Sequence, residues 1–148
     1  MKIQQAIIKQ GNSLMTKQSI KSLKNLRLVI LKHEPEMIWF LHSFSLTLLA
    51  LFLNDALKVC NKAEMPLVIA ALDDRKNKYV VLGIDSPSTK SKRHIFLMFS
   101  NFGAIFRDAA ERVQAHIKHD SFDASIIEVS YLDLTKFLQS LQYFRPLS

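Results

Sequence analysis

Residues 37–54 read MIWFLHSFSLTLLALFLN, eighteen positions without a charged side chain. Glu34-Pro35-Glu36 stand before them, and a proline with neighbouring acids is typical of the first turn of a helix. We therefore expect a long helix from about residue 36 to residue 62. Eighteen residues is close to the lower limit of a membrane-spanning helix, about 17–25 residues. This stretch therefore decides between a core helix of a soluble domain and a single-pass membrane protein spanning about 37–54.

Small and polar side chains favour the core helix. They follow one another at intervals of three or four residues and so share one side of the helix. This polar side continues without a break from the uncharged part of the helix into the charged part. Such a helix is buried over most of its circumference and has one narrow polar edge. Part of this edge is a seam of small residues that suits packing against a second helix, including a second copy of the chain. The edge comprises Ser43, Thr47, Ala50, Asn54, Lys58 and Asn61, and the seam comprises Ser43, Thr47 and Ala50.

The residues after this helix predict a sheet. Two apolar runs, 66–72 and 79–84, flank a polar turn and indicate a hairpin. The expected fold is α+β, with the long apolar helix packed on a mainly antiparallel sheet in the order helix-β-β-β-helix-β-helix. The remaining expected elements are a third strand over 94–99, a helix capped by Ser100-Asn101 and ending near Lys118, a fourth strand over 124–129, and a last helix preceded by Ser130 and Asp133 at capping-box spacing.

The positive charge is confined to the beginning of the chain. Of the net charge of +7, all seven units come from residues 1–33, which contain seven basic residues and no acid. Residues 34–148 contain thirteen basic and thirteen acidic residues. We therefore divide the chain into a basic N-terminal arm over 1–33, either part of the same domain or partner-binding, and a single α+β domain over 34–148. In the arm we expect a strand over 2–10, a turn at Gly11-Asn12 and a basic helix from Thr16, while the apolar run 26–31 suits either a helix or a buried strand.

This arm and a polar loop near residue 90 predict a surface for nucleic acid or an acidic partner. Clustered basic side chains contact phosphate backbones without reading base sequence, and they also attract acidic proteins. The candidate residues are Lys2, Lys9, Lys17, Lys21, Lys24 and Arg27 in the arm, and Lys90, Lys92 and Arg93 in the loop.

No motif indicates a catalytic, metal or cofactor site. The chain has no G-x-S-x-G elbow and no glycine-rich phosphate loop, and its three glycines are far apart. A single cysteine, Cys60, excludes an internal disulfide and fits a reducing compartment. We therefore expect a cytoplasmic protein that is not an enzyme and holds no cofactor.

Two partial resemblances concern DNA. The helix, three-strand, helix, strand order resembles the core of restriction-endonuclease-like nucleases. The expected third strand, HIFLMFS from residue 94, lacks the acid and lysine of those enzymes, so the resemblance implies no nuclease activity. Residues 9–14, KQGNSL, resemble the start of swapped-hairpin antitoxin and transition-regulator proteins, which are small DNA-binding dimers. The following Met15-Thr16-Lys17 departs from that family's isoleucine-proline-lysine, so no site residue is transferred.

Three functions remain open at this point. The leading hypothesis is a small non-enzymatic interaction or accessory protein of bacterial type, which pairs with itself or another protein through exposed apolar helix surface. It rests on the absence of a site motif and on a mean hydropathy of +0.08, with a long helix more apolar than one small core needs. The alternatives are a nucleic-acid-binding protein that uses the arm and the 90–93 loop, and a single-pass membrane protein.

Overall fold

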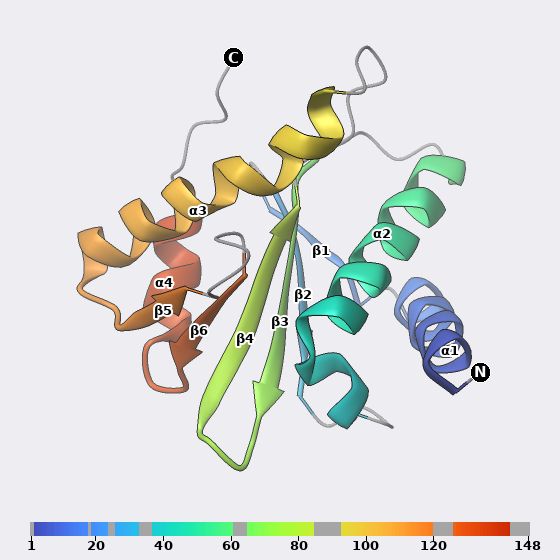
Figure 1. Ribbon diagram of the computed structural model, residues 1–148, viewed down its shortest axis with the longest axis horizontal. Coiled ribbons are helices and arrows are strands. Elements are labelled where there is room, and N and C mark those ends of the chain that lie inside the picture. The colour runs from blue at the N-terminus through green and yellow to red at the C-terminus, as the bar shows by residue number, and fades with distance from the viewer. Residues whose placement is uncertain are drawn as a thin grey trace.

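A six-stranded sheet lies between two layers of helices in the computed structural model (Figure 1). The structure describes residues 2–17, 19–23, 26–32, 37–60, 65–84, 93–119 and 126–142. The strands are β1 (Lys21–Ser22), β2 (Arg27–Leu31), β3 (Leu67–Asp73), β4 (Lys78–Ile84), β5 (Ile117–His119) and β6 (Ile126–Ser130). The helices are α1 (Lys2–Thr16), α2 (Ser43–Val59), α3 (Arg93–Val113), α4 (Leu134–Leu141) and a short 3₁₀ helix, η1 (Met37–Leu41).

The sheet is mixed and has the strand order β1-β2-β3-β4-β6-β5. β2 and β3 are parallel, and the chain between them crosses over through η1 and α2, as parallel neighbours require. The other four neighbouring pairs in the described sheet are antiparallel. The α+β class is therefore confirmed, with a mixed sheet and four α-helices in the part of the chain that the structure describes.

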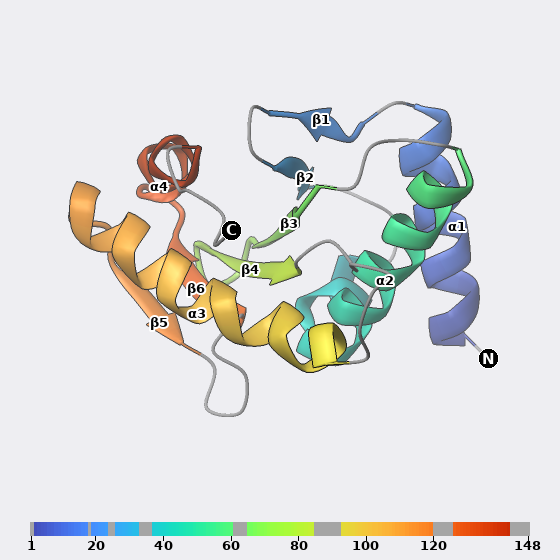
Figure 2. The same ribbon diagram turned by 90° about the horizontal axis from the view of Figure 1, so that it is seen from above.

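Helices cover both faces of this sheet, and two hydrophobic clusters result. Seen from above, α1 and α2 lie on one side of the central strands and α4 on the other, while α3 runs across the view (Figure 2). The buried side chains of α3 and α4 belong to one cluster. Alternate residues of β3 divide between the clusters, since Leu67 and Ile69 face α1 and α2, whereas Val68 and Ala70 face α3 and α4. Strands buried on both faces appear as continuous apolar runs, as these do.

The predicted hairpin is present as β3 and β4. Their register runs from Leu67 opposite Ile84 to Asp73 opposite Lys78. The turn between them includes Asn77 with a φ of 52°, a left-handed conformation that asparagine tolerates. This part of the fold follows from local sequence alone.

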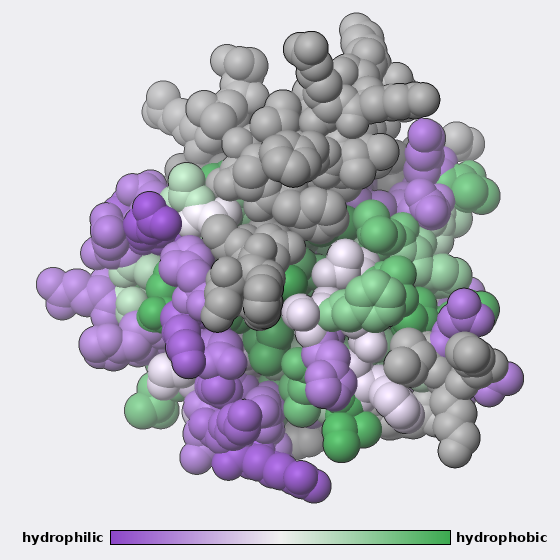
Figure 3. Space-filling view, in the orientation of Figure 1, coloured by the Kyte–Doolittle hydropathy of each residue, from purple (hydrophilic) through white to green (hydrophobic). Residues whose placement is uncertain are grey.

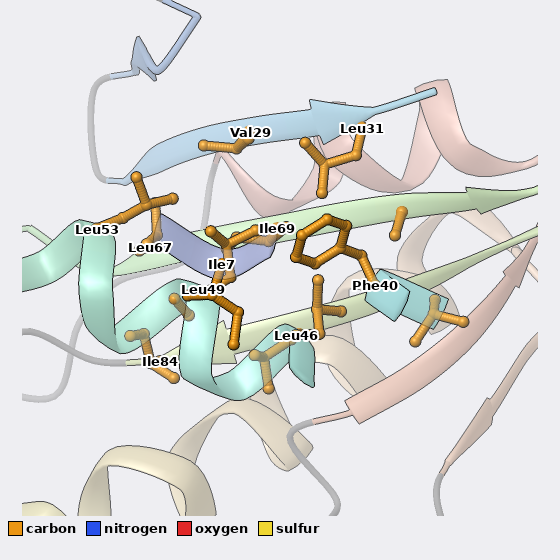
Figure 4. Packing of buried hydrophobic residues seen from close by; sticks show 14 of the residues in the cluster. Ile7, Val29, Leu31, Phe40, Leu46, Leu49, Leu53, Leu67, Ile69 and Ile84 are labelled. Carbon is orange, nitrogen blue, oxygen red and sulfur yellow. The ribbon is translucent and has the colours of Figure 1, made fainter. Parts of the chain in front are cut away.

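Residues 37–54 form core structure, as the core-helix prediction expected. They divide into η1 and the first part of α2, whereas we had expected one helix from about residue 36. Phe40, Leu46, Leu49 and Leu53 are fully buried and point toward β2 and β3 (Figure 4). Within the residues that the structure describes, no helix is both long enough and apolar enough to cross a membrane.

The secondary structure expected for the arm is wrong. Residues 2–10 and the Gly11-Asn12 turn lie within α1, which packs against α2. A Cβ on Gly11 would lie 2.3 Å from two ring atoms of Phe52, so this glycine permits close helix packing rather than a turn. In place of a basic helix from Thr16, the structure has the short strand β1 at 21–22, and the ambiguous run 26–31 contains β2.

The expected strand over 94–99 is also wrong, because these residues belong to α3. Ser100-Asn101 are therefore inside the helix and do not cap it. α3 ends at Val113, earlier than predicted, where Gln114 adopts a φ of 55° and Ala115 N–H donates to the carbonyl of Ala110. The chain then forms β5, which the sequence analysis assigned to the helix.

Candidate functional site

The structure divides the predicted basic surface. Lys9, Lys17 and Lys21 are exposed on or near α1 and β1. Arg27, by contrast, is buried in β2, with 6% of its surface exposed. Lys2 and Arg93 are the first residues of α1 and α3. Three further candidates, Lys24, Lys90 and Lys92, lie outside the described residues.

The small-residue seam is only partly at the surface. Ser43 and Thr47 are half-buried, and the Thr47 hydroxyl donates a hydrogen bond to the carbonyl of Ser43 at 2.7 Å. Ala50 is 1% exposed and belongs to the cluster formed by α1, α2 and the sheet. At Ala50 the polar edge of α2 therefore faces the interior of its own domain.

A different side of α2 carries large apolar residues into solvent. Phe44 is 70% exposed, Val59 is 82% exposed, and Leu51 is also exposed. Their spacing of seven and eight residues places them on one side of the helix, which also carries the exposed Asp55 and Lys58. We name the three apolar residues the α2 apolar face. Hydrophobic colour gathers over this half of the molecule and hydrophilic colour over the α3 half (Figure 3). The sequence predicted exposed apolar surface on this helix but did not identify its residues, because an almost wholly apolar helix does not indicate which side remains exposed.

A second exposed apolar site lies at the turn between β6 and α4. Leu132 is 85% exposed, and Tyr131 stacks on buried Tyr79 with ring centroids 6.1 Å apart. The Tyr131 N–H donates to the carbonyl of Asn77, which ties this turn to the β3–β4 hairpin. Burial raises the pKa of the Tyr79 hydroxyl, and so does the neighbouring Tyr131.

Asp133 connects α4 to β5 and does not form the expected capping box. Its carboxylate makes no side-chain cap for α4 and instead accepts a hydrogen bond from the His116 N–H at 3.0 Å. Lys136 lies 3.2 Å from the same carboxylate. The hydrogen bond from His116, followed by the contact with Lys136, lowers the pKa of Asp133.

A pair of charged side chains also joins β4 to β6. Lys78 on β4 pairs with Glu128 on β6 at 2.5 Å. Glu128 contributes to a hollow of about 330 Å³ beside the start of α2, together with His42, Lys118 and His119. Among the described residues, no three histidine, cysteine or acidic side chains converge as a metal site would require. The hollow therefore offers polar and charged contacts.

Comparison with known proteins assigns the chain to a family. The CDC45 family model matches residues 1–144. The cell division control protein 45 homolog of Dictyostelium discoideum is 34% identical over 139 residues, which are 94% of this chain and 21% of that protein. The homolog of Schizosaccharomyces pombe is 30% identical over 152 residues, covering 97% of this chain and 24% of that protein. The chain thus spans about a quarter or less of the length of these relatives.

The fold agrees with a solved structure. The crystal structure of CDC45 from Entamoeba histolytica superposes with a TM-score of 0.72 at 24% identity, over 95% of this chain and 27% of that one. The relatives are eukaryotic proteins, so the expectation of a bacterial-type accessory protein is wrong. The match over residues 1–144 and the similarity to these homologs show that the chain belongs to the CDC45 family.

Proposed function

We propose that the chain acts in the initiation of eukaryotic DNA replication, as part of a CDC45-type factor that has no catalytic activity of its own and works within a helicase complex. Family membership supports this role. Because the chain spans about a fifth of the Dictyostelium relative, the proposal concerns the contribution of this domain. Because a replication factor acts in the nucleus, the proposal places the chain there, whereas the single cysteine had suggested the cytoplasm.

The α2 apolar face is the observation that supports a protein contact. Exposed apolar groups gathered on one helix side are characteristic of surfaces that another protein covers. Phe44 is the expected anchor, because aromatic side chains contribute strongly to binding when a partner buries them. The proposed occupant is an apolar surface of another protein of the helicase complex.

The test measures recovery of helicase subunits with the tagged chain from dividing cells. We expect the double substitution Phe44→Ser and Val59→Ser to reduce recovery at least about tenfold, since removing an aromatic anchor costs about 2 kcal/mol or more. Leu132→Ser is the matched control, because it removes an equally exposed apolar side chain at a different place. Equal recovery with the double variant and the unchanged chain would refute the docking role of this face.

Nucleic-acid contact by the arm is a second candidate function. Lys9, Lys17 and Lys21 are exposed, and residues 1–33 contain no acid to neutralise them. We expect single-stranded DNA to bind with strong salt dependence, and substitution of these three lysines by Gln to lower the slope of log K against log salt by about two units. Fluorescence anisotropy measures this slope. Gln at exposed Lys76, Arg107 and Lys118 serves as the control, and an equal loss in both variants would contradict a specific role of the arm.

Self-association through Ser43, Thr47 and Ala50 stays a prediction. The burial of Ala50 in its own domain means that a second copy would reach mainly Ser43 and Thr47. Light scattering on the purified chain distinguishes a dimer from a monomer. A dimer that persists in Thr47→Leu would count against the seam as its interface.

A further inference from the structure

Arg27 is a largely buried cation, and its side chain has no partner among the residues that the structure describes. Val29 and Leu31, on the same strand, point into the cluster beneath α1 and α2, and strand alternation directs Arg27 to that same face. Its backbone N–H donates to the carbonyl of Pro66 at 2.8 Å. Among the described residues, its guanidinium forms no ion pair and no side-chain hydrogen bond. Buried arginine normally has both.

A cavity of about 470 Å³ lies beside this side chain. Its volume falls within the range of small-molecule pockets, about 300–1,000 Å³. The wall is mostly apolar and comes from the ends of α1 and α2 and from the segment leading into β1. Besides Arg27, the lining residues are Leu14, Met15, Ile20, Ser22, Leu57 and Cys60.

The guanidinium lies beside two helix ends, which do not satisfy its hydrogen-bond donors. Leu14 and Met15 belong to the last turn of α1, while Leu57 and Cys60 belong to the end of α2. The carboxyl end of a helix carries partial negative charge, which stabilises a nearby cation. Burial opposes this effect and lowers the pKa of Arg27. Guanidinium has five N–H donors and no acceptor, so a ligand with negatively charged acceptor atoms would complete the arrangement.

We propose that this Arg27 cavity binds a monocarboxylate with an apolar body. The carboxylate oxygens would accept hydrogen bonds from the guanidinium, a geometry in which arginine holds carboxylates with two parallel bonds. The apolar body would lie against Leu14, Met15 and Leu57. Two helix carboxyl ends beside the site disfavour a doubly charged phosphate. This inference does not depend on the proposed role in replication.

The test uses hexanoate as the probe and titrates it into the full chain while amide resonances near the cavity are followed by NMR. We expect shifts at Ser22 and Arg27, and binding at least about tenfold weaker for hexan-1-ol and for hexyl phosphate. Arg27→Met should weaken hexanoate binding about ten- to a hundredfold, as expected for loss of a charged hydrogen bond. Arg27→Lys should retain part of it. Lys32→Met is the matched control, because it removes an exposed cation one residue beyond the same strand.

A second variant makes the test independent of the charge change. Met15→Trp fills the cavity while leaving Arg27 in place and should reduce hexanoate binding by at least about tenfold. Unweakened binding in Arg27→Met, or shifts confined to residues away from the cavity, would overturn the proposal.

The source of the carboxylate is resolved by competition. An acetylated tripeptide ending in leucine is added to the hexanoate complex, once with a free terminal carboxylate and once as the amide. Displacement by the carboxylate form alone assigns the site to a protein C-terminus. Absence of displacement by either form assigns it to a free organic acid.

Discussion

The two sides of the sheet differ in how completely each satisfies its own groups. On the α3 and α4 side, Phe106 packs against Phe102 and Phe137 with ring centroids 5.2 and 5.7 Å apart, and exposed charges pair, as Asp108 does with Arg112. The α1 and α2 side carries the α2 apolar face and Arg27, whose guanidinium has no ion pair with any described residue. Here the Gln10 Nε2 atom also lacks a hydrogen-bond partner among the described residues.

Apart from the exposed Leu132 at the turn before α4, this difference separates a side whose groups are largely paired from one that is suited to contacts. A surface that is covered by charged and paired groups gains little from a partner. Exposed apolar groups and an unpaired buried cation gain from one, because a partner removes apolar area from water or supplies a missing acceptor. The proposed protein contact and the proposed carboxylate cavity both lie on the α1 and α2 side.

The largest expected effect on stability appears when two phenylalanines, one from each side of the sheet, are compared. Phe137→Ala on α4 should lower the free energy of unfolding by about 3–5 kcal/mol, because the side chain is fully buried and its loss leaves a cavity. Phe44→Ser on α2 should change it by less than about 0.5 kcal/mol, as expected for an exposed position. Urea unfolding followed by circular dichroism measures both. A cost for Phe44→Ser similar to that of Phe137→Ala would show that Phe44 serves stability rather than contact.

An intermediate effect on stability is expected when two glycines that face aromatic rings are compared. A Cβ on Gly83 would lie 2.4 Å from Phe102 and 2.8 Å from Phe106, both fully buried, so Gly83→Ala should cost about 1–3 kcal/mol. Gly11→Ala meets the ring of Phe52, which is only partly buried and can shift. Alanine also favours the α1 helix by about 1 kcal/mol, so the net cost should be smaller. Thermal unfolding of the two variants tests this order, and the reverse order would mean that α1 and α2 are the more tightly packed side.

The smallest expected effect concerns pH on the α4 side. The folded-state pKa of Asp133 lies below its unfolded value, so its contacts with His116 and Lys136 stabilise the fold above about pH 4. This contribution is lost as the pH falls through the folded-state pKa. Asp133→Asn should therefore reduce the dependence of unfolding free energy on pH between about 5 and 2. Asp108→Asn, at a more exposed carboxylate, is the control and should change it less.

An element of the fold could be predicted from the sequence when the residues that specify it are adjacent in the chain. The hairpin of β3 and β4 was predictable because two apolar runs and a polar turn are adjacent in the chain. The final helix was predictable from its apolar spacing, although the role of Asp133 was not, since its donor His116 belongs to another element. Residues 94–99 were assigned to a strand because a short apolar run fits either structure. Their place in α3 follows from continuation of the helical spacing through Phe102 and Phe106.

The candidate sites were less predictable than the fold. Arg27 was grouped with surface lysines because a count of charges along the sequence does not show which way each side chain points. Its burial follows from alternation along β2, and β2 was itself one of two readings of residues 26–31. The three residues of the α2 apolar face were likewise hidden within an apolar run, where inward and outward positions have similar side chains.

The sequence by itself determined that residues 66–84 form a hairpin, that residues 37–54 contribute a core helix, and that the basic surplus lies in residues 1–33. Only the tertiary structure decided that residues 2–16 form a helix against α2 and that Arg27 points inward. The physical reason is that local patterns specify the period of an element, whereas the side that becomes buried depends on neighbours distant in the chain. Gly11 against Phe52 is one such contact.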